Sequence, residues 1–446
     1  MLRAAVSPAA PLPAGLLLAP AVALLGVILT HWKGMSLTAD GWAMWQGAAS
    51  LATGQGFSYF SGHPIAAWPP LYPLYLALWT LVLGPSGLSL VVSHGTLIAL
   101  QAYLWAWLFR RIADDSALPV TLAAQLLLST FLGLFLCQSQ PTILAHTLVY
   151  TLLPLLLWAL WRLMAPRVSR QVSPPTPRSL PPPERASLAL GIVVGALLLL
   201  SHNAAIVFVA AGAAIVALRW PPSRRSIAGA AALFAVPFLV WTLTRYGFGQ
   251  AGSHRFGWGV GRFGPATYLG QLVSGVGDLL LPPRSVAKFA ALPLLLAAAA
   301  VLYATGRERG LRLGVGFVLQ AALFTVALFT LTFVSNPLSG ARFIGFIPLI
   351  LVPLVFQSAD RGWPRTARAA LIALIALQAY WIVLGARNMW LRSPTELGFV
   401  QDWEETRFVP LDAHIDRSYR GRPPVRTDTG FLVAPPSFEE TPGRRD

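Results

Sequence analysis

Asp40 is the first candidate for chemistry, because it is the only acidic residue among the first 113 positions. It follows the first long apolar segment and precedes an aromatic and proline-rich stretch, residues 68–73 (WPPLYP). A lone carboxylate beside a membrane is costly to keep unless it has a function. Such a group can act as a general base. The alternative is that it starts and caps a short surface helix over residues 43–49.

Several arginines could provide positive charge near this carboxylate. Arginine supplies almost all of the net charge of +16, since Lys33 and Lys288 are the only lysines. The guanidinium group binds phosphate well because its planar fork donates paired hydrogen bonds. The candidates are Arg342, Arg255 with its neighbour His254, and Arg245. Each has a plainer interpretation: Arg342 as an interfacial arginine at a helix end, Arg255 as a solvated loop charge, and Arg245 as an interfacial anchor.

The composition requires that these residues be positioned by membrane helices. The 446 residues are 55% hydrophobic and only 11% charged, whereas a soluble domain has about 25% charged residues. Long apolar runs recur, so the spans are helices rather than the short alternating strands of a barrel. The basic balance does not indicate nucleic-acid binding, because the arginines fall in short loops between apolar runs, where they set topology. The fold class is therefore an all-α polytopic membrane protein.

About eleven transmembrane helices are expected. A span needs about 20 apolar residues, and nine segments qualify: 14–31, 88–109, 118–136, 142–163, 226–244, 286–304, 313–333, 342–358 and 369–391. The apolar run 187–218 is too long for one span. Three polar residues, Ser201, His202 and Asn203, interrupt it, so we predict two short helices that meet at a polar turn.

Charge distribution determines the orientation. Five basic clusters lie at residues 110–111, 162–185, 219–225, 307–312 and 361–368, and basic loops stay on the cytoplasmic side. All five lie inside if the short segment 70–84 does not cross, so we interpret it as a juxtamembrane or re-entrant helix. The N-terminus is then cytoplasmic and the C-terminus external, in the inner (plasma) membrane.

This topology divides the chain into a transmembrane domain, residues 1–391, with external loops 32–69 and 245–285, and a short external tail, 392–446. It also places five further contact candidates outside: His63, Trp68, Tyr72, Gln140 and His202. The aromatic residues could stack on a ligand or lie in the interfacial aromatic belt. A lone histidine is more often a structural hydrogen-bonding residue, and we favour that interpretation for His202.

The first external loop resembles that of the GT-C superfamily of multi-span glycosyltransferases, which are related to protein mannosyltransferases and lipid A aminoarabinose transferases. The resemblance is carried by residues 40–57 (DGWAMWQGAASLATGQGF), the pair 63–64 (HP) and residues 68–73. Later segments match in order but more weakly: 139–141 (SQP), 241–246 (WTLTRY), 252–255 (GSHR) and 340–348 (GARFIGFIP). The chain departs from the family pattern at Gln140, where the family has an acid, and at His202, in a turn where the family has an arginine.

The resemblance implies the GT-C fold and an inverting hexosyl- or pentosyltransferase. The sugar would move from a polyprenyl-phosphate donor to a protein, lipid or glycan acceptor on the external face. The enzyme would be embedded in membrane lipid. Asp40 would be the base, Arg342, Arg255, His254 and Arg245 would bind the donor phosphate, and the five contact candidates would touch substrate.

No cofactor is expected. Some GT-C branches use a divalent cation with two acids in the first loop, but this loop has one acid, so a metal is possible but not supported. Two other functions remain open: a ligase or polymerase of lipid-linked glycans, and a transporter or flippase. The sequence shows no paired broken helices in related halves, as many transporters do.

Overall fold

The structure is a computed structural model. It describes residues 14–31, 36–37, 39–58, 65, 68–84, 87–115, 130–131, 133, 145–164, 182–218, 224–247, 264–281, 286–305, 309–331, 341–362, 364–392, 399–402, 407–410, 425–426 and 432–433. Among these residues, six helices are long and apolar enough to cross a membrane, and several shorter apolar helices accompany them. The protein is an all-α polytopic membrane protein, as predicted.

The helices are α1 (Ala14–His31), α2 (Ala39–Ala52), α3 (Leu71–Leu83), α4 (Gly87–Asp115), α6 (Ala145–Leu163), α7 (Pro182–Ser201), the short 3-10 helix η1 (Asn203–Ala205), α8 (Ile206–Ala217), α9 (Arg224–Gly247), α10 (Pro265–Leu280), α11 (Lys288–Thr305), α12 (Arg309–Leu331), α13 (Ala341–Ile344), α14 (Phe346–Gly362) and α15 (Pro364–Arg392). The short strands are β1 (Ser36–Leu37), β2 (Phe399–Asp402), β3 (Arg407–Pro410), β4 (Val425–Arg426) and β5 (Leu432–Val433).

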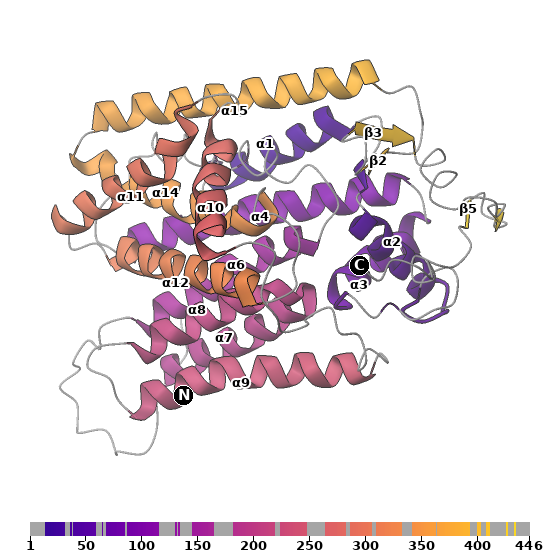
Figure 1. Cartoon of the computed structure of the whole chain (residues 1–446), viewed down its shortest axis with the longest axis horizontal. Helices are drawn as coiled ribbons and strands as arrows, with labels where there is room; N and C mark the ends of the chain where they lie inside the picture. The colour runs from indigo at the N-terminus through magenta and orange to yellow at the C-terminus, as the bar shows by residue number, and fades with distance from the viewer. Residues whose placement is uncertain are drawn as a thin grey trace, which may run out of the picture.

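The long helices run side by side in a bundle, with α15 along one edge and α9 along the other (Figure 1). The pairs α1–α4, α6–α7 and α7–α9 pack against each other. The core between them contains large buried rings, and the ring of Phe208 lies 6.2 Å from that of Phe317 and 5.1 Å from that of Phe346. Burial of such rings against one another stabilises the central helices, because aromatic pairs contribute beyond their buried area.

Ten of the predicted spans fall on described helices, and the span 118–136 lies largely outside the described residues. The predicted break in 187–218 is confirmed: α7 ends at Ser201, and α8 begins at Ile206 after η1. The segment 70–84 forms α3, with 13 residues. At 1.5 Å per residue this helix is about 20 Å long, which is shorter than a hydrocarbon core of about 30 Å.

The first loop forms a helix of its own. Helix α2 ends in a Schellman motif, in which the Gln55 N–H donates to the Ser50 carbonyl at 2.8 Å and the Gly54 N–H donates to the Leu51 carbonyl at 3.2 Å. Gly54 has φ +76°, a left-handed conformation that glycine adopts without steric cost. Helix α2 packs against α3, so the loop presents a folded surface at one end of the bundle.

The tail returns to the same end of the bundle as the first loop. Strand β1 pairs in parallel with β2, with Ser36 opposite Phe399 and Leu37 opposite Val400, and β2 pairs antiparallel with β3. Figure 1 shows α2, α3 and these strands gathered at one end of the long helices. Since β1 immediately precedes α2, the tail is attached next to the segment that contains Asp40.

The segment 245–285, expected as an external loop, contains a helix. Helix α10 begins with Pro265 after Gly264 and ends at Leu280. Its buried side chains Tyr268, Leu272 and Val276 recur every four residues, which places them on one helix face. In Figure 1, α10 runs across the direction of the long helices. The apolar face of α10 is buried because it packs on α11 and α12.

Candidate functional site

His202 lies at the turn between α7 and η1, where its extended backbone (φ −157°, ψ 135°) breaks the helix. Its backbone N–H still donates to the Leu198 carbonyl at 3.1 Å. Its imidazole Nδ1 accepts a hydrogen bond from the Ala204 N–H at 3.0 Å and so caps η1. A nitrogen that accepts in this way carries no proton, so the ring is the neutral form with its proton on Nε2. His202 is therefore both a cap and a hydrogen-bond donor.

His146, the second residue of α6, lies against His202. The two ring centroids are 4.0 Å apart and the rings are tilted by 42°. Each histidine is only 8% exposed. This contact joins the start of α6 to the turn between α7 and α8, and it places two imidazoles together inside an otherwise apolar part of the bundle.

The ring contacts continue on both sides of the histidine pair. Trp68, just before α3, has its ring centroid 5.8 Å from that of His202. Phe343, in α13, meets His146 edge-on at 5.2 Å. The series Trp68–His202–His146–Phe343 thus connects the end of the first loop with the segment that follows Arg342.

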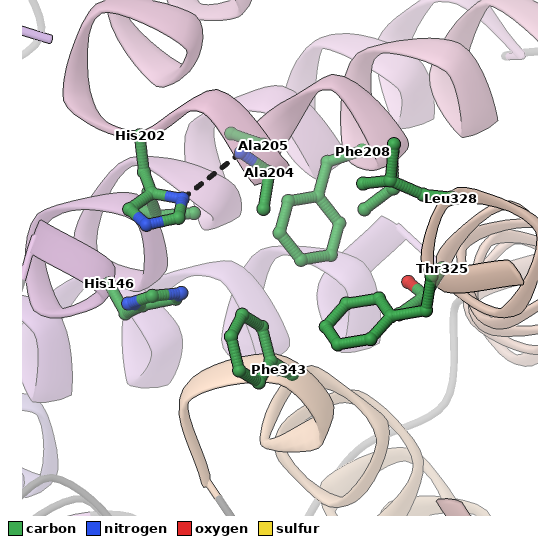
Figure 2. Close-up of a pocket in the computed structure, with 11 residues that line it drawn as sticks. His146, His202, Ala204, Ala205, Phe208, Thr325, Leu328 and Phe343 are labelled. Atoms are coloured by element: carbon green, nitrogen blue, oxygen red, sulfur yellow. Dashed lines mark hydrogen bonds between the residues drawn. The ribbon is translucent and has the colours of Figure 1, made fainter. Parts of the chain in front are cut away.

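A pocket opens beside the histidine pair, with an empty volume of about 320 Å³ that includes space open to solvent. Figure 2 shows His146 and His202 on one side of it and Thr325 and Leu328 facing them across the pocket. The remaining lining comes from apolar side chains of α6, η1, α8, α12 and α13: Val149, Ala204, Ala205, Val207, Phe208, Phe329 and Phe343. The arrangement has two imidazoles on one side and mainly aromatic and aliphatic groups, with Thr325, on the other.

Of the residues singled out in the sequence, the structure brings Trp68 and His202 into contact. Tyr72 is fully buried between α2 and α3 and packs in a cluster with Trp45 and Ala145. Burial, with a smaller effect of Tyr75, raises the pKa of the Tyr72 hydroxyl well above its usual value. Within the described part of the chain that hydroxyl has no hydrogen-bond partner. Tyr72 is thus a packed neutral residue four positions after Trp68.

Asp40 and Arg342 are placed by their backbones. Asp40 is the second residue of α2, in the first turn, where a carboxylate is stabilised by the helix dipole. Arg342 is the second residue of α13, directly before Phe343. The side chains of both residues lie outside the described part of the structure, as do the whole residues His63, Gln140, His254 and Arg255.

Arg245 lies near the end of α9, with its guanidinium carbon 5.0 Å from the ring centroid of Trp241. The Trp241 indole N–H in turn donates to the Asn203 side-chain oxygen at 3.1 Å. Asn203 follows His202 in the chain, so this pair of contacts ties the end of α9 to the turn that holds the histidine.

Sequence reasoning missed His146 and Phe343. The available signal for His146 was an imidazole near the start of the predicted span 142–163, since ionisable groups inside membrane segments are rare and often functional. No local signal marked Phe343. Among the described residues no group of three histidine, cysteine or acidic side chains is arranged to hold a metal ion.

Comparison with known proteins identifies the fold. No protein-family model and no curated protein matches this sequence. The crystal structure of ArnT from Cupriavidus metallidurans in the apo state is similar, with a TM-score of 0.52 and 12% identity over 84% of this chain and 74% of that one. An oligosaccharyltransferase of Archaeoglobus fulgidus, in complex with Zn and sulfate, gives a TM-score of 0.47 at 13% identity over 86% of this chain and 53% of that one. Archaeal oligosaccharyltransferase AglB from the same organism, in complex with an inhibitory peptide and a dolichol-phosphate, gives 0.43 at 13% identity over 96% and 61%. The likeness to ArnT shows that the chain has the GT-C fold.

Proposed function

We propose that this GT-C-fold protein is an integral membrane glycosyltransferase that moves a sugar from a polyprenyl-phosphate donor to an acceptor on the external face of the membrane. The observation that supports this most is the ring series Trp68–His202–His146–Phe343. The series brings the end of the first loop, the α7–α8 turn and the segment after Arg342 together, and three of its four rings, those of His202, His146 and Phe343, line the pocket. The first loop and the segment around Arg342 are segments in which the sequence resembles GT-C enzymes, and the turn at His202 is one where it departs from the family pattern.

The reaction uses Asp40 as the general base. The carboxylate takes the proton from the acceptor hydroxyl, and the hydroxyl oxygen forms a bond to the anomeric carbon of the sugar. The bond between that carbon and the phosphate oxygen breaks on the opposite side, so the configuration inverts. Its electron pair stays on the polyprenyl phosphate, where the negative charge grows. Arg342, with Arg255 and His254, stabilises this charge.

The histidine pair and Trp68 hold the sugar. The Trp68 ring offers an apolar face to the sugar ring, and the His202 Nε2–H is a donor for a sugar oxygen. His146 is added to the candidates made from sequence, because its ring lies against that of His202 and lines the same pocket. Two neutral imidazoles provide donors and acceptors without placing a fixed charge in the membrane.

The donor phosphate assignment is tested with two arginine variants of matched position. The purified protein is placed in lipid nanodiscs with a panel of synthetic polyprenyl-phosphate sugars and a membrane extract as acceptor source, and released polyprenyl phosphate is measured by mass spectrometry. Arg342→Ala should raise the KM for the donor and lower release. Arg365→Ala is the control, because Arg365 is also the second residue of its helix, α15, but is exposed at the end away from β2. Equal donor dependence in the two variants would refute the role of Arg342.

The sidedness of the loop is tested by cysteine labelling. Gln55 is exposed just after α2, so a Gln55→Cys variant, in a Cys137→Ser background, should react with a membrane-impermeant maleimide added outside. A Ser173→Cys variant should react only after the membrane is opened. The reverse labelling pattern would place the first loop on the cytoplasmic side and would refute an external reaction.

A further inference from the structure

The turn that holds His202 is fastened from a helix outside the pocket. The Trp241 indole N–H on α9 donates to the Asn203 side-chain oxygen at 3.1 Å. The guanidinium of Arg245, one helical turn further along α9, lies over the same indole at 5.0 Å. Neither Trp241 nor Arg245 lines the pocket, and the hydrogen bond to Asn203 connects them to the turn that holds His202.

The hydrogen bonds of this turn determine which nitrogen of His202 carries the proton. The His202 Nδ1 is held by the Ala204 N–H at 3.0 Å, and the His202 carbonyl accepts from the Ala205 N–H at 3.0 Å. Asn203 lies between these two bonds in the chain. A shift of Asn203 would therefore move the Ala204 N–H relative to the imidazole, and the ring would lose the bond that keeps its proton on Nε2.

We propose that Trp241 and Arg245 are positioning residues for His202: Trp241 fixes the turn through Asn203, and Arg245 holds the indole in place by a cation–π contact. This inference rests on the proposed function in so far as His202 contacts the sugar. It gives Arg245 a role different from donor phosphate binding. It also predicts that the indole N–H, rather than the bulk of the Trp241 side chain, matters for turnover.

Trp241→Phe tests the proposal because it keeps an aromatic ring for Arg245 and removes the N–H donor. Trp158→Phe is the matched control. Trp158 also carries an arginine four residues on, with Arg162 at 5.7 Å from the ring, but on α6 it is about 18 Å along the helix axis from His146. Its ring packs on Trp107 at 5.3 Å instead.

The first readout is the protonation form of His202, which does not depend on any transfer activity. The protein is labelled with ¹⁵N-histidine, and the His202 signals are assigned by their loss in a His202→Asn variant. Wild type and Trp158→Phe should show one form, with the proton on Nε2. Trp241→Phe should show exchange between the two neutral forms. A His202 spectrum that is unchanged in Trp241→Phe would overturn the proposal.

The second readout is sugar transfer. Trp241→Phe should lower kcat/KM about two- to tenfold, the range that corresponds to one hydrogen bond, and Trp158→Phe should leave it unchanged. In a His202→Asn background, Trp241→Phe should not lower kcat/KM further, because the imidazole through which Trp241 acts is already absent. An equal loss in both backgrounds would also overturn the proposal. If neither wild type nor any variant transfers sugar, but the His202 spectrum changes in Trp241→Phe and not in Trp158→Phe, the proposed function fails and the positioning role stands.

Discussion

His202 performs two separable tasks, and two substitutions distinguish them. Its Nδ1 caps η1 by accepting from the Ala204 N–H, and its ring contacts the rings of Trp68 and His146. His202→Ala removes the cap and the ring. His202→Asn removes the ring but keeps a side-chain oxygen that can accept the same N–H, since asparagine is among the best capping residues.

The expected losses follow from these contacts. Loss of a cap costs about 0.5–2 kcal/mol, and each ring pair contributes about 0.5–1.5 kcal/mol. The Asn variant should therefore lose about 1–3 kcal/mol from its two ring pairs. The Ala variant should lose a further amount of about 0.5–2 kcal/mol for the cap.

The assay is thermal denaturation of the three proteins in one detergent at one scan rate, combined with transfer measurements in nanodiscs. The melting temperatures should fall in the order wild type, His202→Asn, His202→Ala. Transfer should fall by the same factor in both variants, because both lack the imidazole. An Asn variant no more stable than the Ala variant would refute the cap, and an Ala variant as stable as wild type would refute both contributions.

Three further predictions concern the first loop, the tail and metal dependence. Gly47→Ala should destabilise the protein, because its new Cβ would lie 2.7 Å from both Phe57 and Ile65, an overlap that costs about 1–3 kcal/mol. Gly270→Ala, in an exposed and open part of α10, should instead stabilise the protein by about 1 kcal/mol. Thermal scans that show no difference in stability between the two variants would contradict this packing. Truncation after Arg392 removes β2, the strand that pairs with β1 beside α2. The truncated protein should still insert into the membrane but should transfer sugar more slowly, as measured by release of polyprenyl phosphate. Full activity would show that the tail does not support the first loop. Treatment with EDTA should leave the transfer rate unchanged, and a loss restored by a divalent cation would show a metal requirement.

The membrane helices could be predicted from sequence because their signal is local. The first span was expected at 14–31, and α1 has these bounds. The break within 187–218 could also be predicted, since three polar residues at the centre of an overlong apolar run cannot continue as one span at low cost. Both features depend only on residues close together in the chain.

Helix α10 was not predicted, because the segment 245–285 contains no apolar run long enough for a span. Its apolar residues Tyr268, Leu272 and Val276 occupy one face of a 16-residue helix, and their four-residue spacing was the signal available. The helix is too short and too polar on its other side to register as a span.

The composition of the pocket was predicted only in part. Trp68 and His202 were candidates because they stood out in their local sequence, and they do meet. His146 reaches His202 only because α6 packs on α7 and α8, a contact between distant parts of the chain. Ring contacts of this kind follow from helix packing and cannot be read from residue spacing.

The measurement that tests the central claim most directly is polyprenyl phosphate release by Asp40→Asn, compared with wild type at equal amounts of inserted protein. The amide is nearly the same shape as the carboxylate but cannot accept the acceptor's proton, so the rate should fall about 10²- to 10⁴-fold, with little change in melting temperature. Release at the wild-type rate would contradict the assignment of Asp40 as the base.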